Sequence, residues 1–457
     1  MDRILQDLSD YAWGLAYGDL PQEVIDRTKH IVVDTMGCAL GAAQSPPAVI
    51  ARAVASEVTS AAPATVLVSG QKTSPDLAAF VNGVMIRYLD FNDTYTSFAT
   101  CHPSDLLAPV LAAVDATHGS GRDVILGMVL GYEVYCGLLD SGAMDRELCW
   151  DQSTYGVIAA AVVAAKLLGL SKEQMANAIS LATVSHLTLE QVRRGQISHW
   201  KGCALANASR NAVFSAMLAS KGMTGPEEVF EGKEGFMKGT GVTFELQPLA
   251  GSGQQYRIMS ARIKAFPSGY FSQSAIEAVL DLRSRIPAID DIKEVRLQTF
   301  PSGYQVMGSS EANWKPETRE SADHSLPFVM AIGLMEGGLE IRHYDQEYYK
   351  RTDVRALMQK ISVRVGDEPT KAWPEVPLNI VDIEIRSGEV LSTKVAYHLG
   401  HFKRLMSDEE QERKFRPMAE ALLAKRQADS LLACLRQLEQ LERIDDLITL
   451  TLAPNLP

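Results

Sequence analysis

The 457-residue chain contains six scattered cysteines, and no two of them form a CxxC pair or part of a Cys/His spacing typical of a zinc site. This pattern favours reduced thiols over a disulfide framework. The chain also lacks GxGxxG after a strand, GxxxxGK(S/T), GxSxG and HExxH. These absences argue against nicotinamide, nucleotide, serine-hydrolase and zinc-protease chemistry. They favour proton transfer without a metal or an organic cofactor.

Positive charge is the scarcer sign, and the net charge is −12 at pH 7. Nucleic-acid binding needs a clustered basic surface, so we expect no nucleic-acid partner. The start, Met1-Asp2-Arg3-Ile4, lacks the basic and apolar regions of a signal peptide. The most apolar segment, residues 157–170, is too short to span a membrane and predicts a core helix. We therefore expect a cytoplasmic protein with no membrane partner.

Helical patterns dominate the first half of the chain. Ser74-Pro75 is a start signal for a helix running to Asp90, and Ser171 with Gln174 forms a capping box. Ser104 is expected to cap a helix over 106–114. The alanine-rich residues 155–220 predict closely packed helices.

A mixed pattern follows residue 264. Helices are expected over 272–285 and 322–335, and strands over 292–297, 361–365, 380–385 and 390–395. From Ser407 the chain returns to charged amphipathic helix. We expect a mainly α fold, with residues 1–263 and 397–457 forming a large helical domain. Residues 264–396 are expected to form a smaller α+β domain, called the lid domain below.

One polar stretch stands out in the helical half. Residues 87–95 and the following His102-Pro103-Ser104-Asp105 place carboxylates, an amide, a hydroxyl and an imidazole within a short span. Such a concentration in an apolar surround suits acid/base chemistry. Asp90 and Thr94 could orient a base or bind a substrate hydroxyl, and His102 could transfer protons near neutral pH. The alternative is a solvated loop with Asx turns and a structural histidine.

Cations and turns further along could complete such a site. Lys201 begins a helix, where a cation opposes the helix dipole and needs an anionic partner, unless it extends past Trp200 to water. Arg193 and Arg194 could bind an anion or lie in a solvated turn. Lys264 begins the run KAFPSG, at the point where the helical pattern gives way to a mixed pattern of helices and strands.

Two short runs of the second half are further candidates. Ser268 and Gly269 could present backbone N–H groups to a carboxylate, although a plain turn is the default. The run Asp323-His324-Ser325 could only cap the apolar helix that follows it, or His324 could reach the cleft. Sites often form at domain junctions, so these residues could face the polar stretch.

The combination of motifs resembles the MmgE/PrpD family. The matching blocks follow in the family's order: LDFNDTY (89–95), HPSD (102–105), WDQSTYG (150–156), HWKGCALANASRN (199–211), KAFPSG (264–269) and ADHSLPF (322–328). The resemblance implies a helical domain closed by C-terminal helices, an α+β lid, and a site between them without metal or cofactor. It also implies a homodimer.

Carried over position by position, the resemblance implies five catalytic residues: Asp90, Thr94, His102, Lys201 and Lys264. His102 would be the acid/base group oriented by Asp90, and Thr94 would bind a substrate hydroxyl or carboxylate. The two lysines would hold carboxylates and stabilise enolate-like charge. Arg194, Ser268, Gly269 and His324 are expected to contribute to substrate binding.

Two departures from the family pattern concern the lid. No histidine follows the FP turn in residues 268–273, and Phe328 stands where tyrosine is common. His324 could substitute for the missing imidazole. The resemblance implies a lyase of the 2-methylcitrate dehydratase type, linked to propionate metabolism, acting on a small hydroxy-polycarboxylate. The alternatives are a cis-aconitate-type decarboxylase, a dicarboxylate epimerase or isomerase, and a non-catalytic carboxylate-binding member.

Overall fold

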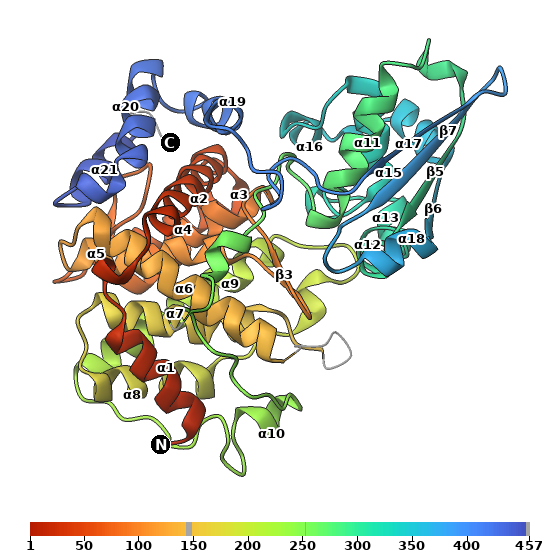
Figure 1. The fold of residues 1–457 in the computed structure, drawn as a ribbon. Helices are drawn as coiled ribbons and strands as arrows, with labels where there is room; N and C mark the ends of the chain where they lie inside the picture. Colours follow the sequence, from red (N-terminus) through yellow and green to blue (C-terminus); the bar gives the residue numbers. More distant parts are fainter. Residues whose placement is uncertain (143–148, 252, 454–457) are drawn as a thin grey trace.

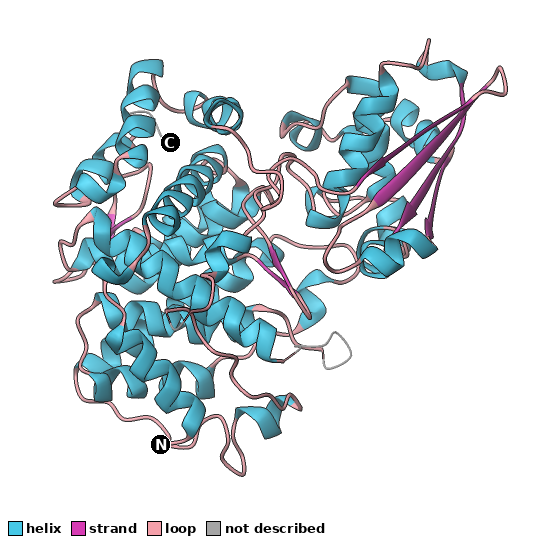
Figure 2. Cartoon of the chain, viewed as in Figure 1, coloured by secondary structure: helices cyan, strands magenta, loops and turns pink. Residues whose placement is uncertain are grey.

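The computed structural model describes residues 1–142, 149–251 and 253–453. Figure 1 shows a large helical body and a smaller body with a sheet along its outer side. The chain ends in helices that return to the large body, so both described termini lie on it. Figure 2 shows how helix dominates the larger body and how the long strands are confined to the smaller one. The mainly α class expected from the sequence is confirmed.

The helical body is built around two helices that cross the molecule, α4 (Pro75–Tyr88) and α9 (Trp200–Ser220). Proline at the first position of α4 suits the helix start, as the sequence predicts. A Cβ on Gly83 would come within 2.9 Å of the Ala206 side chain, so glycine lets the two backbones approach. The surrounding helices are α1 (Arg3–Gly14), α2 (Gln22–Gly41), α3 (Pro46–Ala55), α5 (Leu107–Ala116), α6 (Gly121–Ser141), α7 (Ser153–Leu167), α8 (Lys172–Ser185) and α10 (Phe236–Thr240).

Helix α6 has the length and apolar composition of a membrane span. Within its most apolar window, 89% of the helix is buried inside the protein. Its neighbours include α5 and α7. The helix is therefore accounted for as part of the hydrophobic core.

The lid domain contains a four-stranded sheet in the order β6-β5-β7-β8. β5 (Ile292–Thr299) pairs parallel with β6 (Ile361–Val365) and antiparallel with β7 (Asn379–Ile385), which pairs antiparallel with β8 (Val390–Val395). Alternate residues of β7 are buried, because one sheet face packs on helices and the other meets solvent. The helices are α11 (Gln273–Arg283), α12 (Pro301–Met307), α13 (Glu311–Trp314), α14 (Arg319–Ala322), α15 (Leu326–Glu336), α16 (Arg342–Asp345), α17 (Thr352–Met358) and α18 (Asp367–Ala372).

The C-terminal helices return to the helical body: α19 (Asp408–Glu420), α20 (Lys425–Arg436) and α21 (Asp445–Leu450). Phe415 and Met418 of α19 pack against the glycines of α2, where a Cβ on Gly37 would meet both side chains at 3.1 Å. Buried apolar residues accordingly form two clusters. One combines residues 4–263 with 406–448, and the other lies within residues 270–391. The chain passes from one body to the other near Ile263 and returns near Gly400. A hydrogen bond from Ile263 N to Gly400 O, at 2.9 Å, joins these two segments.

Two details differ from the sequence-based expectation. Ser104 does not cap the helix after it, because Pro103–Leu106 forms a short 3-10 turn and α5 begins at Leu107. The helix expected over 322–335 is interrupted: α14 ends at Ala322 and α15 begins at Leu326. Ser325 causes this restart, since its side chain accepts a hydrogen bond from Phe328 N. The interruption turns the side chains of residues 323 and 324 towards the helical body.

Candidate active site

Asp90 follows the C-terminal end of α4, in a left-handed conformation with φ of 49°. Aspartate tolerates this region better than most residues, and the turn directs the carboxylate into the protein. Only 1% of Asp90 is exposed. Arg87 Nη1 lies 2.6 Å from its Oδ1, and Lys264 Nζ contacts the same oxygen while donating to the Asp90 carbonyl at 2.9 Å. The carboxylate is therefore a buried anion held by cations from both parts of the chain.

Lys201 joins this anion to the lid domain. Its Nζ donates to Asp90 Oδ2 at 2.9 Å and to Asp323 Oδ1 at 3.0 Å. Lys201 lies in the first turn of α9, where a cation is disfavoured by the helix dipole. The two carboxylates compensate for that cost, so the anionic partner that the sequence calls for belongs to the protein itself.

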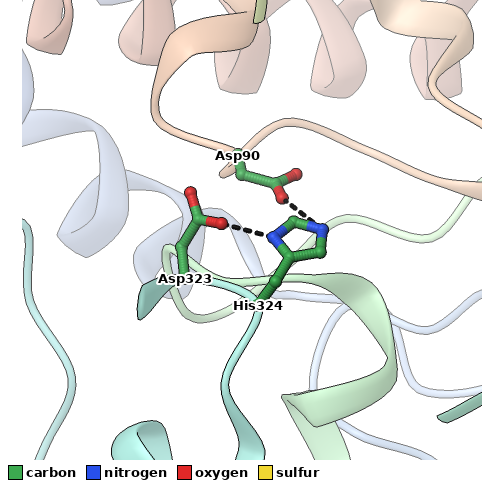
Figure 3. A group of neighbouring side chains, drawn as sticks. All are labelled: Asp90, Asp323 and His324. Atoms are coloured by element: carbon green, nitrogen blue, oxygen red, sulfur yellow. Dashed lines mark hydrogen bonds and ion pairs between the residues drawn. The ribbon is translucent and has the colours of Figure 1, made fainter. Parts of the chain in front are cut away.

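Figure 3 shows Asp90, Asp323 and His324 drawn together from the two bodies. His324 Nδ1 contacts Asp323 Oδ1, and Nε2 faces Asp90 Oδ2 at 3.5 Å. Asn313 Nδ2 donates to the His324 carbonyl at 2.8 Å and supports the break between α14 and α15. The imidazole is thus flanked by two carboxylates and reaches the cleft, one of the two alternatives that the sequence leaves open.

His102 faces the same region from the helical body. Its Nδ1 lies 2.8 Å from the Asp93 carbonyl, and its backbone N donates to Gln152 Oε1 at 3.1 Å. A carbonyl can only accept a hydrogen bond, so Nδ1 carries the hydrogen and donates it to the Asp93 carbonyl. Nε2 then carries the lone pair, and no hydrogen bond to it is found within residues 1–142, 149–251 and 253–453.

The expectation that Asp90 orients His102 is wrong. The Asp93 carbonyl does so, because Asp90 is committed to Arg87 and the two lysines. Thr94 Oγ1 lies 3.3 Å from His102 Nδ1 and is fully buried. Thr94 therefore supports the imidazole from behind, which differs from the expected contact with substrate.

The electrostatics of this cluster divide it into ionised and neutral groups. Burial alone raises the pKa of the Asp90 carboxyl, but Arg87, Lys201 and Lys264 outweigh burial and hold that pKa well below its usual range. Burial lowers the pKa of Lys264 to about 8, although Asp90 opposes the shift. Burial, reinforced by Arg87, holds the pKa of His102 well below its usual range. His102 is therefore a neutral imidazole near neutral pH, as a base must be.

Burial shifts the pKa values of the two neighbouring lid residues, Asp323 and His324, in opposite directions. Burial alone raises the pKa of Asp323, but Lys201 and His324 lower it below its usual value. Burial, with the nearby Lys201 ammonium, lowers the pKa of His324. An anionic substrate beside His324 would raise that pKa again and favour the protonated imidazole.

A cavity of about 90 Å³ lies between the two imidazoles. Two arginines, an amide, two carboxylates and an apolar wall complete it. Its lining residues are Asp90, Thr100, His102, Gln152, Glu190, Arg193, Arg194, Ile197, Gly269, Tyr270, Phe271, Val306, Met307 and His324. A larger cavity, of about 840 Å³, lies beside Tyr88 and Arg319. We take the smaller one as the candidate site because both imidazoles line it.

The cations that line this cavity are arginines. Arg193 Nε contacts the buried Asp151 carboxylate, and Arg194 Nη2 lies 3.3 Å from Glu190 Oε1. Lys201 and Lys264 do not line the cavity and lie behind Asp90. Their ammonium groups contact protein carboxylates in this structure, Lys201 with Asp90 and Asp323 and Lys264 with Asp90, so their direct contact with substrate stays a prediction.

The turn at residues 268–269 also has a different role from the expected one. Ser268 N donates to the Phe266 carbonyl and Gly269 N to the Asp323 carbonyl, at 2.8 and 2.9 Å. Ser268 Oγ donates to the same Asp323 carbonyl at 2.8 Å. These N–H groups are not available to a substrate carboxylate. They hold the backbone that carries Asp323, while Gly269 lines the cavity.

The oxygen and nitrogen atoms of Asp90, Asp323 and His324 lie within 4.8 Å of one another, close enough to share a cation. The Lys201 ammonium lies among them, at 2.9 Å from Asp90, 3.0 Å from Asp323 and 3.2 Å from His324 Nδ1. These side chains therefore fit an internal ammonium, which supplies the positive charge that a metal would otherwise provide.

The nine residues selected from the sequence converge on this cavity. Five of them line it: Asp90, His102, Arg194, Gly269 and His324. The other four contact either a lining residue or Asp323: Thr94, Lys201, Lys264 and Ser268. Asp323, Gln152 and Arg87 also belong to the site, although the sequence alone did not assign a role to them. The first two lie inside the shared blocks at 322–328 and 150–156, which is the signal that could have found them.

Sequence models of a two-domain family match the chain along most of its length. The MmgE/PrpD N-terminal domain matches residues 6–248, and the MmgE/PrpD C-terminal domain matches residues 266–440. The fold and the two-sided site are those of a helical domain with an α+β lid. The chain belongs to the MmgE/PrpD family.

Characterised relatives carry two kinds of activity in their names. The chain is 27% identical to cis-aconitate decarboxylase from Homo sapiens, over 97% of this chain and 93% of the relative. It is 28% identical to 2-methylcitrate dehydratase from Salmonella typhimurium, over 88% of this chain and 87% of the relative. It is 27% identical to 2-methylcitrate dehydratase, mitochondrial, from Yarrowia lipolytica, over 88% of this chain and 81% of the relative. These relatives are enzymes, and they differ in the reaction that they catalyse.

Proposed function

We propose that the chain is a cofactor-independent lyase of the 2-methylcitrate dehydratase type, acting on a small hydroxy-polycarboxylate. The observation that carries the proposal is the pair of imidazoles, His102 and His324, which line one cavity from the two bodies. Elimination of water needs a base at the carbon next to a carboxylate and an acid at the leaving hydroxyl. We also propose a cytoplasmic enzyme that acts as a homodimer.

His102 is the base in this proposal. Its Nδ1–H is held by the Asp93 carbonyl and its pKa is depressed, so Nε2 has a free lone pair at neutral pH. Nε2 removes the proton, and the electron pair left on carbon is delocalised into the neighbouring carboxylate.

His324 is the acid in this proposal. Asp323 and Asp90 flank its ring and stabilise the imidazolium, which gives its Nε2 proton to the leaving hydroxyl. The hydroxyl departs as water as the carbon–carbon double bond forms. The proton taken by His102 then passes to solvent and His324 takes up a proton from solvent, so both imidazoles return to their starting states.

The substrate carboxylates are assigned to Arg193 and Arg194. Buried Asp151 holds Arg193 in place, and a guanidinium suits bidentate binding of a carboxylate. Lys201 and Lys264 act indirectly, since they keep Asp90 ionised beside His324. Phe271 and Met307 add an apolar wall that could receive a methyl group.

Epimerisation is the second candidate, because two imidazoles on facing walls also suit removal of a proton from one face and its return to the other. To distinguish the two, the protein is incubated in D2O with 2-methylcitrate, citrate, cis-aconitate and aspartate-derived imines. Dehydration gives the ultraviolet absorbance of a conjugated double bond. Deuterium incorporation without net loss of water supports epimerisation, and released carbon dioxide supports decarboxylation. Failure of every substrate to react or exchange would overturn the lyase proposal.

A further inference from the structure

A buried lysine from the C-terminal helices contacts the backbone behind the candidate site. Lys414 lies in α19, and its side chain is 5% exposed. Its Nζ donates to the Phe91 carbonyl at 2.8 Å and to the Lys264 carbonyl at 2.9 Å. Asp34 Oδ1 of α2 lies 2.5 Å from the same nitrogen. Two of the three ammonium protons therefore go to the carbonyls, and the Asp34 carboxylate balances the charge as a buried ion pair.

The two carbonyls belong to the two segments that form the central charge contact. Phe91 directly follows Asp90, and Lys264 is the residue whose ammonium contacts the Asp90 carboxylate. The Phe91 ring also lies 4.0 Å from Lys414 Nζ, a cation–π contact that orients the same segment. One ammonium therefore bridges the two backbone segments that carry Asp90 and Lys264.

Anchoring of α19 does not by itself explain this lysine. Phe415 and Met418 already pack on the glycines of α2, and Gln411 Nε2 donates to the His30 carbonyl at 2.6 Å. A buried ion pair is also weak evidence for stability, because desolvation offsets much of its Coulomb energy. What distinguishes Lys414 from these anchors is its position at the backbone beside the site.

We propose that Lys414 is a positioning residue, which holds the carbonyls of Phe91 and Lys264 so that the Lys264 ammonium meets the Asp90 carboxylate. The C-terminal helices thereby take part in building the site. This inference rests on the proposed function only in that the Asp90–Lys264 contact belongs to the reacting site.

The test compares variants that separate positioning from folding. Lys414→Met alone leaves the Asp34 carboxylate buried without its partner, so the double variant Asp34→Asn/Lys414→Met removes both charges. Asp34→Asn alone keeps the lysine on its two carbonyls. Arg413→Met is the control, since Arg413 neighbours Lys414 on α19 but its side chain is 75% exposed. Thermal unfolding gives the folded fraction of each variant.

On 2-methylcitrate, per folded enzyme, the double variant should lose about tenfold or more in kcat with little change in KM. Asp34→Asn and Arg413→Met should retain activity close to wild type. Lys414→Arg, which keeps a cation at this position, should lose less kcat than the double variant. A folded double variant with wild-type kcat would overturn the proposal, as would a loss equal to that of Asp34→Asn.

A second readout does not depend on turnover. In protein labelled with ¹⁵N at the lysine Nζ, the buried ammonium signal of Lys264 should move in the double variant and stay in place in Arg413→Met. If wild type turns over none of the acids, the lyase proposal fails while this measurement still decides the role of Lys414. An unchanged Lys264 signal in the folded double variant contradicts positioning.

Discussion

Replacing Lys201 with methionine tests the buried charge network most severely. The substitution keeps most of the side-chain volume but removes the ammonium between Asp90 and Asp323. Asp90 keeps Arg87 and Lys264, whereas Asp323 keeps only the more distant Arg319, at 3.6 Å, and His324 among the described charged partners. The penalty therefore falls mainly on Asp323.

Removing one partner of a buried ion pair costs about 3–5 kcal/mol. Because Asp323 keeps two other partners, we expect a cost of about 3 kcal/mol. That is about a hundredfold in the unfolding equilibrium constant. In wild type the pKa of Asp323 is lowered, so its contribution is present above the unfolded value of about 4 and is lost as pH falls. Without Lys201 the folded-state pKa of Asp323 rises, so the penalty should be largest at pH 7 and smaller at pH 4.

Urea unfolding followed by tryptophan fluorescence at the two pH values measures this penalty. Lys293→Met is the matched control, because Lys293 pairs with Glu384 on the lid surface with 65% of its side chain exposed. We expect little change in its midpoint. Equal midpoint shifts for the two variants, or a Lys201→Met penalty that does not depend on pH, would refute the buried network.

Three further substitutions test the cavity. His102→Asn keeps a donor for the Asp93 carbonyl and should lower kcat about 10²- to 10⁴-fold at nearly unchanged stability; wild-type kcat would remove His102 from the mechanism. Arg193→Met should lower kcat/KM about 10- to 100-fold through the lost carboxylate contact, and an effect confined to thermal stability would make Arg193 structural. Gly269→Ala places a Cβ 3.0 Å from Met307 and 3.4 Å from His324 Nε2. Calorimetry should show that the free energy of unfolding falls by about 1 kcal/mol, and kinetics should show a raised KM. Unchanged values of both would show that the cavity accommodates the added methyl group.

Local signals in the sequence predicted much of the fold. Ser74-Pro75 marks the start of α4, and the capping box of Ser171 with Gln174 is present at α8. The alternating strands were located correctly because one sheet face is buried and the other is solvated. The helix expected over 322–335 lacked the break at Asp323–Ser325, because the apolar run has helical spacing, although capping by this run was one of the two alternatives for it.

The sequence could identify which residues gather at the site but not which of them contact one another and which face the cavity. Lys201 and Lys264 are cations near a cleft, and substrate binding was the natural expectation. Only the three-dimensional contacts show that Asp90 pairs with both lysines and that Asp323 pairs with Lys201. His102 likewise lies near Asp90 in sequence, yet the carbonyl of Asp93 orients it.

Proton exchange in D2O tests the central claim most directly. Wild type and His102→Asn are incubated with 2-methylcitrate, and ¹H NMR follows the signals next to the carboxylates together with the product. The account predicts product formation by wild type, with deuterium entering the remaining substrate at the carbon that His102 deprotonates, and loss of both in His102→Asn. Elimination and exchange at wild-type rates in His102→Asn would contradict it.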